Sequence, residues 1–346
     1  MHKITICGHF GGNEKFLDGQ TIKTKNIYLA LLDKYDEKEI NRIDTYHWKK
    51  QPIIFLKKCL KGIKESKNII ILPAQNGVRV FIPLFLLINK LYKRRIFYIV
   101  IGGWLPEFLK NRKGLLKKIK KLDKVFVETN KMKRQLANLK IENVEILVNF
   151  KNITPLKEEE LNFNHSKPYK LCTFSRVIQE KGIEDAIQVV KNINEEFNEI
   201  VYKLDIYGPI DEKYKERFTK IINNTPEYIQ YKGCIDSEKS VNILKNYYLL
   251  LFPTKFKTEG IPGTIIDALS AGVPIVASRW DNVDEIIIDG INGLIYEFNN
   301  LADFYAKLKT MLNCQKVFII KKNCVECAKN FDSNIAIEPL TNALIG

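Results

Sequence analysis

Short, almost wholly apolar runs alternate with helical stretches through the first half of this 346-residue chain, and this alternation constrains its fold most strongly. The runs read KITICG, NIIILP, IFYIVIG, KVFVET and VEILVNF. Strands that are apolar on both faces are typical of parallel sheets with helices on both sides. The second half repeats the pattern, and a chain of this length accommodates two cores. We therefore predict an α/β protein with two doubly wound parallel sheets.

A polar segment separates the two halves. Residues 149–170, NFKNITPLKEEELNFNHSKPYK, contain two prolines and no sustained hydrophobic periodicity, so we predict a linker there. This places one domain at residues 1–152 and a second at residues 153–325. The remaining residues, 326–346, include an amphipathic segment and form a third predicted unit.

A loop and a helix in the second half carry the most specific chemical signal. Residues 256–262 form a loop with one carboxylate, Glu259, and residues 263–270 are predicted to be a helix that contains Asp267. A Gly- and Pro-rich loop at a helix amino terminus leaves backbone N–H groups unpaired, which suits a diphosphate, and the flanking carboxylates could bind hydroxyls. A second helix is expected at residues 285–289.

At these residues the chain resembles the retaining glycosyltransferases of family four, which have the GT-B fold of two facing Rossmann-like domains. In that family a Glu in the loop is followed eight positions later by a second Glu. The pair here is Glu259 and Asp267, so the second side chain is one methylene shorter. The resemblance implies that Glu259 contacts the transferred sugar and Asp267 the ribose hydroxyls. It also implies donor contacts from the loop and helix start at Gly260, Ile261, Pro262, Gly263 and Thr264.

The rest of the donor half resembles the family at a strand, a loop and an amphipathic helix in residues 170–191. Arg176 and Lys181 bracket the loop and resemble the Arg and Lys that hold the donor phosphates in the family. Cations aimed at a departing diphosphate stabilise its growing charge. A solvated basic loop is the alternative for such a pair. The pair precedes the Glu259 segment in the order that the family shows, and this favours the phosphate role. The resemblance adds Gly208, Gly233 and Cys234 as donor contacts near the base.

A Gly-rich loop follows the first strand. Asp18 is predicted to cap a helix that opens at Gly19 and Gln20. In the family a Gly-rich turn at this helix entrance approaches the donor phosphates, and either Gly11 with Gly12 or Gly19 could supply it. We favour Gly19 and Gln20 because they adjoin the helix, although an ordinary turn is the alternative.

The acceptor side carries a weaker signal. Many family members have a His after a central strand of the first domain, where this chain has Gly103 and Trp104, so no histidine base is assigned. Candidate acceptor contacts are His9, Asn76, Gly103 and Trp104. A core or lid position is the alternative for the tryptophan.

Charge is unevenly distributed along the chain. Residues 1–152 contain 32 Lys and Arg against 13 Asp and Glu, a net charge of +19, whereas the remainder carries −4. The excess concentrates at residues 90–95 and 110–124, and the latter has Leu115, Leu116, Ile119 and Leu122 at helical spacing. A lysine-rich helix with one apolar edge, next to the apolar run FIPLFLLI, predicts contact with anionic lipid. The alternative is a solvated face. FIPLFLLI is shorter than the about 20 residues that span a bilayer.

Localisation and cofactors follow from composition. The seven cysteines form no even framework, which favours reduced cytosolic thiols, and the amino terminus leads directly into a strand without a signal peptide. No zinc-type spacing and no Asp-x-Asp motif is present, so we expect no metal and no cofactor.

These observations predict a cytoplasmic, membrane-peripheral, metal-independent hexosyltransferase. It would move a sugar from a nucleoside diphosphate sugar to a saccharide acceptor, which we expect to be lipid-linked, with retention of configuration, in bacterial capsular or other surface polysaccharide synthesis. The resemblance implies that residues 326–346 cross back to the first domain. A sugar-nucleotide epimerase or phosphorylase of the same fold is one alternative, and a basic nucleic-acid-binding protein is another. We expect no nucleic-acid partner, because stacking aromatics are sparse among the lysines of residues 110–124.

Overall fold

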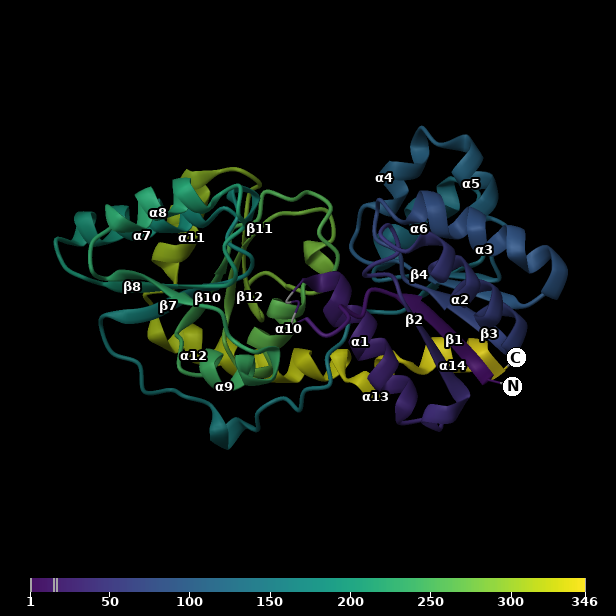
Figure 1. Ribbon diagram of the computed structural model, residues 1–346. Coiled ribbons are helices and arrows are strands. Elements are labelled where there is room, and N and C mark those ends of the chain that lie inside the picture. The colour runs from purple at the N-terminus through teal and green to yellow at the C-terminus, as the bar shows by residue number, and fades with distance from the viewer. Residues whose placement is uncertain (1, 15, 17, 346) are drawn as a thin grey trace. The chain divides into compact units, whose positions relative to one another are not determined.

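The computed structural model describes residues 2–14, 16 and 18–345, which fall into two compact units (Figure 1). Unit 1 comprises residues 1–152, 260–262 and 333–346, and unit 2 comprises residues 153–259 and 263–332. The carboxy-terminal segment that groups with unit 1 therefore begins at Ser333, and the helix before it belongs to unit 2.

Unit 1 contains a six-stranded parallel sheet in the order β2-β1-β3-β4-β5-β6. The strands are β1 (His2–Gly8), β2 (Ile40–Asp44), β3 (Ser66–Ile71), β4 (Arg95–Ile99), β5 (Lys124–Val127) and β6 (Val144–Ile146). The helices are α1 (Gly19–Leu32), α2 (Pro52–Glu65), α3 (Val78–Tyr92), α4 (Leu105–Lys110), α5 (Lys113–Ile119), α6 (Asn130–Asn138), α13 (Ser333–Ala336) and α14 (Glu338–Ile345).

Two hydrophobic clusters explain why the strands of unit 1 are apolar on both faces. Ile69 and Ile71 of β3 pack into the cluster formed with α2 to α6, whereas Ile70 packs into the cluster formed with α1, α13 and α14. Successive side chains of a strand point to opposite faces, so a sheet covered on both sides needs apolar residues at nearly every position.

Unit 2 repeats the architecture with the strand order β12-β11-β10-β7-β8-β9. Its strands are β7 (Tyr169–Phe174), β8 (Tyr202–Tyr207), β9 (Ile229–Gly233), β10 (Leu249–Phe252), β11 (Ile275–Ser278) and β12 (Gly293–Tyr296). Its helices are α7 (Ile183–Phe197), α8 (Lys215–Asn223), α9 (Ser240–Leu244), α10 (Gly263–Ser270), α11 (Leu301–Thr310) and α12 (Cys314–Ala328). All strand pairs are parallel, so the predicted α/β class with two doubly wound sheets is confirmed.

The prediction of a helix at residues 285–289 is wrong. A 3-10 turn spans Val283–Glu285, and the chain then continues without helical structure. The Asn292 amide accepts from the backbone N–H of Ile288 at 2.9 Å and donates to the carbonyl of Ile286 at 3.0 Å. These bonds use backbone groups that a helix would need, which is how Asn side chains compete with helix formation.

The basic segment at residues 110–124 does not have the structure that the sequence predicts. Residues 110–124 do not form one helix, because α4 ends at Lys110, α5 ends at Ile119 and β5 begins at Lys124. Ile119 is fully buried and Leu122 is 4% exposed, and both belong to the core. Leu115 and Leu116 are partly buried against the same core, so little of the apolar edge of this segment is left for contact with lipid.

Two arginines of the other basic segment close helix ends. Arg95 donates to the carbonyl oxygens of Ala343 and Leu344 in α14, at 3.0 and 2.6 Å. Arg94 donates to the carbonyl oxygens of Ile63 and Lys64 in α2. Cations are favourable at helix carboxyl ends, where backbone oxygens lack partners, so these arginines contribute to structure.

Candidate functional site

The order of strands in unit 2 reverses between β7 and β10. The chain runs outward from β7 through β8 to β9, then returns to place β10 on the other side of β7. Because all the strands are parallel, their carboxyl ends meet at one edge, and the loops after β7 and β10 diverge there. In open α/β sheets, ligands bind in the crevice at such a switch point.

Lys181 and Glu259 meet at this switch point. Lys181 follows β7, Glu259 lies in the loop after β10, and the ammonium donates to the carboxylate in an ion pair. The side chains are only 13% and 17% exposed. The geometry therefore holds a cation and a carboxylate in a partly desolvated position, where charge acts more strongly than in water.

Gly182 allows the two loops to approach. It has φ of +67° and precedes α7, and a Cβ on it would overlap the carbonyl oxygen of Pro253 in the β10 loop. Only glycine combines this backbone conformation with so close a contact. The residue after Lys181 thus sets the distance between the lysine and the Glu259 loop.

Several neighbours of the ion pair were not expected from the sequence. The Thr254 hydroxyl donates to Glu259 Oε1 at 3.0 Å, and the Asn282 amide donates to the Glu259 carbonyl at 2.7 Å. The Lys181 ammonium also lies 5.0 Å from the ring centroid of Phe252 and 5.4 Å from that of Phe256. The signal in the sequence was their position at or beyond the end of a buried strand, but only the fold shows which of them reach the pair.

Arg176 lies in the same loop as Lys181, but unlike Lys181 it is not partly buried. Its side chain is exposed, and it forms no ion pair with any other described residue. Gly208, at the end of β8, has φ of +133°, and a Cβ there would overlap the carbonyl of Ser175. Gly208 therefore has a structural reason to be glycine, since it lets the β7 and β8 ends pack together.

Gly233 and Cys234 end β9 at the same edge of the sheet. Gly233 has φ of +79° and its carbonyl accepts from the N–H of Gly208 at 2.9 Å. The Cys234 side chain is exposed. The predicted base contacts therefore lie at carboxyl ends of neighbouring strands.

Helix α10 spans Gly263–Ser270, as predicted. Asp267 is 3% exposed within this helix. The hydroxyl of Thr264, in its first turn, is buried and has no hydrogen-bond partner among the described residues. A buried hydroxyl without a partner is uncommon and suits a ligand oxygen at this helix terminus.

Residues Gly260 to Pro262 pack with unit 1 instead. The Ile261 N–H donates to Glu128 Oε2 at 2.8 Å, and the Asn149 amide donates to the Ile261 carbonyl at 2.8 Å. A Cβ on Gly260 would overlap the Glu128 carboxylate. The Ile261 N–H, expected to contact the donor, is thus already bonded to protein, because Glu128 approaches this glycine closely.

Glu128 is itself paired with a buried lysine. Lys23, 3% exposed, donates to the Glu128 carboxylate and also to the carbonyl of Val100 at 3.1 Å. The Gly102 N–H donates to Glu128 as well, at 3.2 Å. Buried charges are tolerated when they are paired and hydrogen-bonded in this way.

The amino terminus of α1 is capped as predicted. Asp18 accepts from the backbone N–H groups of Gln20 and Thr21, each at 3.0 Å, and from the Thr21 hydroxyl at 2.7 Å. A Cβ on Gly19 would meet nothing within 4 Å, so no close packing requires glycine there. A donor phosphate at this helix end would compete with the Asp18 carboxylate for two N–H groups.

The acceptor candidates have distinct environments. His9 Nδ1 lies 2.7 Å from the Thr21 hydroxyl oxygen, and the ring contacts Tyr46 edge-on. The Trp104 indole N–H donates to the Ile101 carbonyl at 2.6 Å, and its ring packs against the core. Gly103 is buried and Asn76 is exposed. The Trp104 side chain therefore has a structural role. His9 and Asn76 lie in the loops after β1 and β3, and the strand order of unit 1 reverses between these two strands.

The described part of the chain shows neither a metal-binding cluster nor a membrane-spanning helix. Residues 2–14, 16 and 18–345 contain no group of three or more His, Cys, Asp or Glu side chains placed to hold a metal ion. Within the same ranges, every helix is too short or too polar to cross a membrane.

Comparison with known proteins identifies a sequence family. The model of the family described as glycosyl transferases group 1 matches residues 156–331, slightly more than half of the chain. An uncharacterized glycosyltransferase of Methanocaldococcus jannaschii is 28% identical over 197 residues, which cover 56% of this chain and 46% of the relative.

Two further proteins extend the comparison. The N,N'-diacetylbacillosaminyl-diphospho-undecaprenol alpha-1,3-N-acetylgalactosaminyltransferase of Campylobacter jejuni is 24% identical, covering 54% of this chain and 49% of the relative. The chain thus aligns with about half the length of these two curated relatives. The Anabaena protein HepE, solved in complex with UDP-glucose, is 14% identical with a TM-score of 0.76 over 100% of both chains. This likeness confirms the expected GT-B fold with two Rossmann-like domains.

Proposed function

Because the chain belongs to the glycosyl transferases group 1 family, we propose that it moves a hexosyl group from a nucleoside diphosphate sugar to a saccharide acceptor, with retention of anomeric configuration. The observation that carries this proposal is the Lys181–Glu259 pair at the β7/β10 switch point. Exposed Arg176 follows the same strand and adds a second cation.

The proposed chemistry uses these charges in one step. The bond between the anomeric carbon and the diphosphate oxygen breaks, and the departing diphosphate gains negative charge that Lys181 and Arg176 stabilise. The acceptor hydroxyl attacks the anomeric carbon from the same face, and the departing phosphate oxygen takes its proton. Glu259, held by Thr254, would bind hydroxyls of the transferred sugar. Asp267 would bind the ribose hydroxyls.

We propose that this reaction needs no metal ion. A divalent cation in other sugar transferases neutralises the leaving diphosphate, and here Arg176 and Lys181 would do so, together with the positive end of helix α10. The partnerless Thr264 hydroxyl at that helix end supports an anionic ligand there.

We propose a lipid-linked saccharide as acceptor, in the assembly of a bacterial surface polysaccharide such as a capsule. The Campylobacter jejuni relative supports this class of acceptor, since its name describes transfer to a sugar on a diphospho-undecaprenol carrier. Such an acceptor would place the protein at the cytoplasmic face of the plasma membrane.

The surface of α2 and α3 supports this location. These helices pack against each other on one face of the unit 1 sheet. The outward side of α2 exposes Ile53 and Leu56, and that of α3 exposes Leu87 (62%) and Leu91 (79%). We name this surface the α2–α3 face. Its exposed residues are Ile53, Leu56 and Leu60 with Lys57, Lys61 and Lys64 on α2, and Val80, Leu87 and Leu91 with Lys90 on α3.

Exposed apolar side chains interspersed with lysines on the same helices match the chemistry of an anionic membrane. The leucines would enter the headgroup boundary, and each lysine near such a surface contributes about 1 kcal/mol. The α2–α3 face therefore replaces the edge of residues 110–124 as the proposed membrane contact. The remaining exposed lysines of unit 1 add long-range attraction.

A transfer assay tests the proposed function. Purified protein would be incubated with a panel of nucleoside diphosphate sugars and with saccharide acceptors, with and without EDTA, and the released nucleoside diphosphate and the product anomer would be measured. We expect release that depends on acceptor, survives EDTA and yields the anomer of the donor. Inversion of configuration, or loss of activity that magnesium or manganese restores, would contradict the mechanism.

A further inference from the structure

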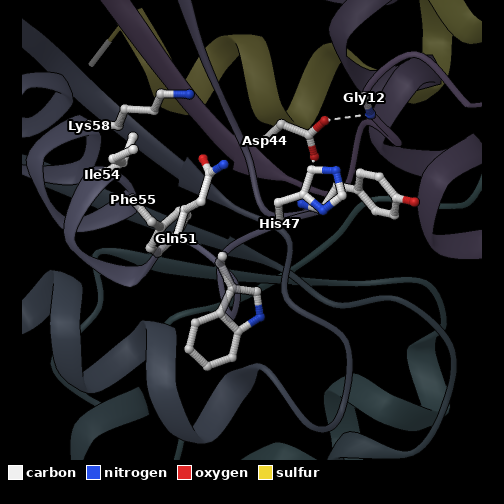
Figure 2. Close-up of a pocket in the computed structure, with 9 residues that line it drawn as sticks. Gly12, Asp44, His47, Gln51, Ile54, Phe55 and Lys58 are labelled. Atoms are coloured by element: carbon white, nitrogen blue, oxygen red, sulfur yellow. Dashed lines mark hydrogen bonds between the residues drawn. The ribbon is translucent and has the colours of Figure 1, made fainter.

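A small cavity lies within unit 1, at the carboxyl end of β2 (Figure 2). Its volume is about 190 Å³, it is open to solvent on one side, and it is lined by the β1–α1 loop at Gly12, the β2–α2 loop and the first two turns of α2. Gly12, the alternative to Gly19 for the phosphate-binding turn, is one of the residues that line it, and the favoured Gly19 and Gln20 are not. Open α/β sheets bind ligands beyond the carboxyl ends of their strands, and β2 lies beside β1, which borders the switch point of this sheet.

The cavity has a rigid aromatic wall. The rings of Trp48 and Phe55 line it, with centroids 6.3 Å apart. Trp48 also contacts Phe81 at 5.3 Å, and Phe81 is buried in the core. Packing on the core side holds the Trp48 ring in place, and the Lys49 ammonium lies over this ring, 5.9 Å from its centroid.

Asp44 also lines the cavity. Its carboxylate accepts from the backbone N–H groups of Phe10, Gly12 and Tyr46 at 3.0, 2.7 and 2.9 Å. This carboxylate therefore ties the loop after β1 to the loop after β2. Gly12 has φ of +57°, and a Cβ there would lie 3.2 Å from the Tyr46 ring, so glycine lets the two loops close together.

Three polar side chains remain for a ligand. Figure 2 shows the head groups of His47, Gln51 and Lys58 around the same space, and no ion pair joins Lys58 to another described residue. Gln51 can both donate and accept, and Lys58 can donate. Together with the aromatic wall, they present hydrogen-bonding groups beside a flat apolar surface.

We propose that this cavity binds one sugar ring of the acceptor saccharide. A pyranose has an apolar C–H face that packs on Trp48, and hydroxyls that Gln51, His47 and Lys58 can bind. The volume is below the about 300 Å³ at which pockets for drug-sized ligands begin, which suits a single ring. A diphosphate fits less well, because one lysine faces the cavity and the Asp44 carboxylate lies beside it.

This inference rests on the proposed function and names where its acceptor binds. Gln51→Ala and Lys58→Ala would test it, with Lys61→Ala as the matched control, since Lys61 is exposed on the same helix and outside the cavity. Saturation-transfer NMR would measure binding of the methyl glycosides of glucose, galactose, N-acetylglucosamine and N-acetylgalactosamine. Inorganic pyrophosphate would serve as the competing probe.

We expect at least one glycoside to bind wild type and Lys61→Ala, and about fivefold weaker binding in each cavity variant, as the loss of one hydrogen bond predicts. Pyrophosphate should not displace it. Equal glycoside binding in all variants, no glycoside binding at all, or displacement by pyrophosphate would overturn the proposal.

A separate readout distinguishes the cavity from the donor site. Calorimetric titration with a nucleoside diphosphate panel should give the same affinity in Gln51→Ala and Lys58→Ala as in wild type. If wild type binds a glycoside but no nucleoside diphosphate, the proposed function fails and the cavity stands. If it binds the nucleotide and no glycoside, the cavity proposal fails alone.

Discussion

Lys181 and Glu259 form an ion pair although 78 residues separate them in the chain. The pair exists because β10 returns to lie beside β7, so that the loops after both strands leave the same edge of the sheet. The Lys181 ammonium is already neutralised by Glu259 before any donor binds. A donor diphosphate would therefore share this lysine with the carboxylate, and its sugar would lie next to Glu259.

Replacing either cation should remove most turnover. Arg176→Ala and Lys181→Ala should each lower kcat by roughly 100-fold, since loss of one preorganised stabiliser of developing charge costs on the order of 3 kcal/mol. Lys220→Ala, an exposed lysine on α8, is the control. Steady-state kinetics with unchanged thermal unfolding would check this, and full activity in both variants would remove these residues from the mechanism.

Substitutions of Glu259 and Asp267 should affect different quantities, namely sugar transfer and nucleotide affinity. Glu259→Gln should reduce transfer far more than it reduces nucleoside diphosphate affinity, because we place Glu259 on the transferred sugar. Asp267→Ala should weaken binding of the nucleoside diphosphate itself. Calorimetry and kinetics on both variants measure the two quantities, and the reverse pattern would mean that the roles are exchanged.

Gly182→Ala should damage the site through the backbone. The substitution strains a φ of +67° and forces the Pro253 carbonyl away, which separates the loops that carry Lys181 and Glu259. We expect a loss of stability on the order of 1–3 kcal/mol, measured by denaturant unfolding, together with lower activity. Gly114→Ala is the control, since its Cβ would meet nothing within 4 Å. Equal stability in both variants would show that the loops can separate freely.

Lys321 in α12 should make stability depend on pH. Burial lowers its pKa from 10.5 to about 8, and its ammonium has no hydrogen-bond partner among the described residues. Between pH 8 and 10.5 the unfolded chain holds this proton and the folded protein does not, so the free energy of unfolding from this group rises with pH. Below pH 8 the buried charge costs about 3 kcal/mol.

Lys321→Met removes that cost while keeping the length of the side chain. Urea unfolding from pH 6 to 10 should show the variant more stable than wild type near pH 7, with the difference shrinking as pH rises. The pKa of His165, lowered to about 4 by burial and secondarily by the charge of Lys321, should also rise in the variant. A difference independent of pH would show that Lys321 does not titrate in this range.

The α2–α3 face should bind anionic vesicles. The protein should sediment with phosphatidylglycerol-containing liposomes at low salt and not with phosphatidylcholine alone, because lysine attraction is screened by salt. Leu87→Gln with Leu91→Gln should release it, whereas Ile319→Gln, equally exposed in unit 2, should not. Unchanged sedimentation of the double variant would place the contact elsewhere.

Local signals in the sequence were sufficient for elements whose cause is local. The cap of α1 by Asp18 and the extent of α10 at Gly263–Ser270 follow from side-chain and backbone groups a few residues apart. The parallel sheets follow from strands that are apolar on both faces, because strands need this pattern only when helices cover both faces of the sheet. The chemistry of the residue types pointed to the Glu259 loop, and the resemblance to the family-four glycosyltransferases pointed to Lys181.

Tertiary structure decided which apolar faces are buried and which side chains meet. Periodicity showed that Leu115 and Ile119 share a face, but the core of unit 1 covers that face, whereas Leu87 and Leu91 stay exposed. A stripe of apolar residues carries no information about what packs on it. The contact of Lys181 with Glu259 depends in the same way on strand order, because the return of β10 to β7 is set by the packing of the whole sheet and by no residue near either side chain.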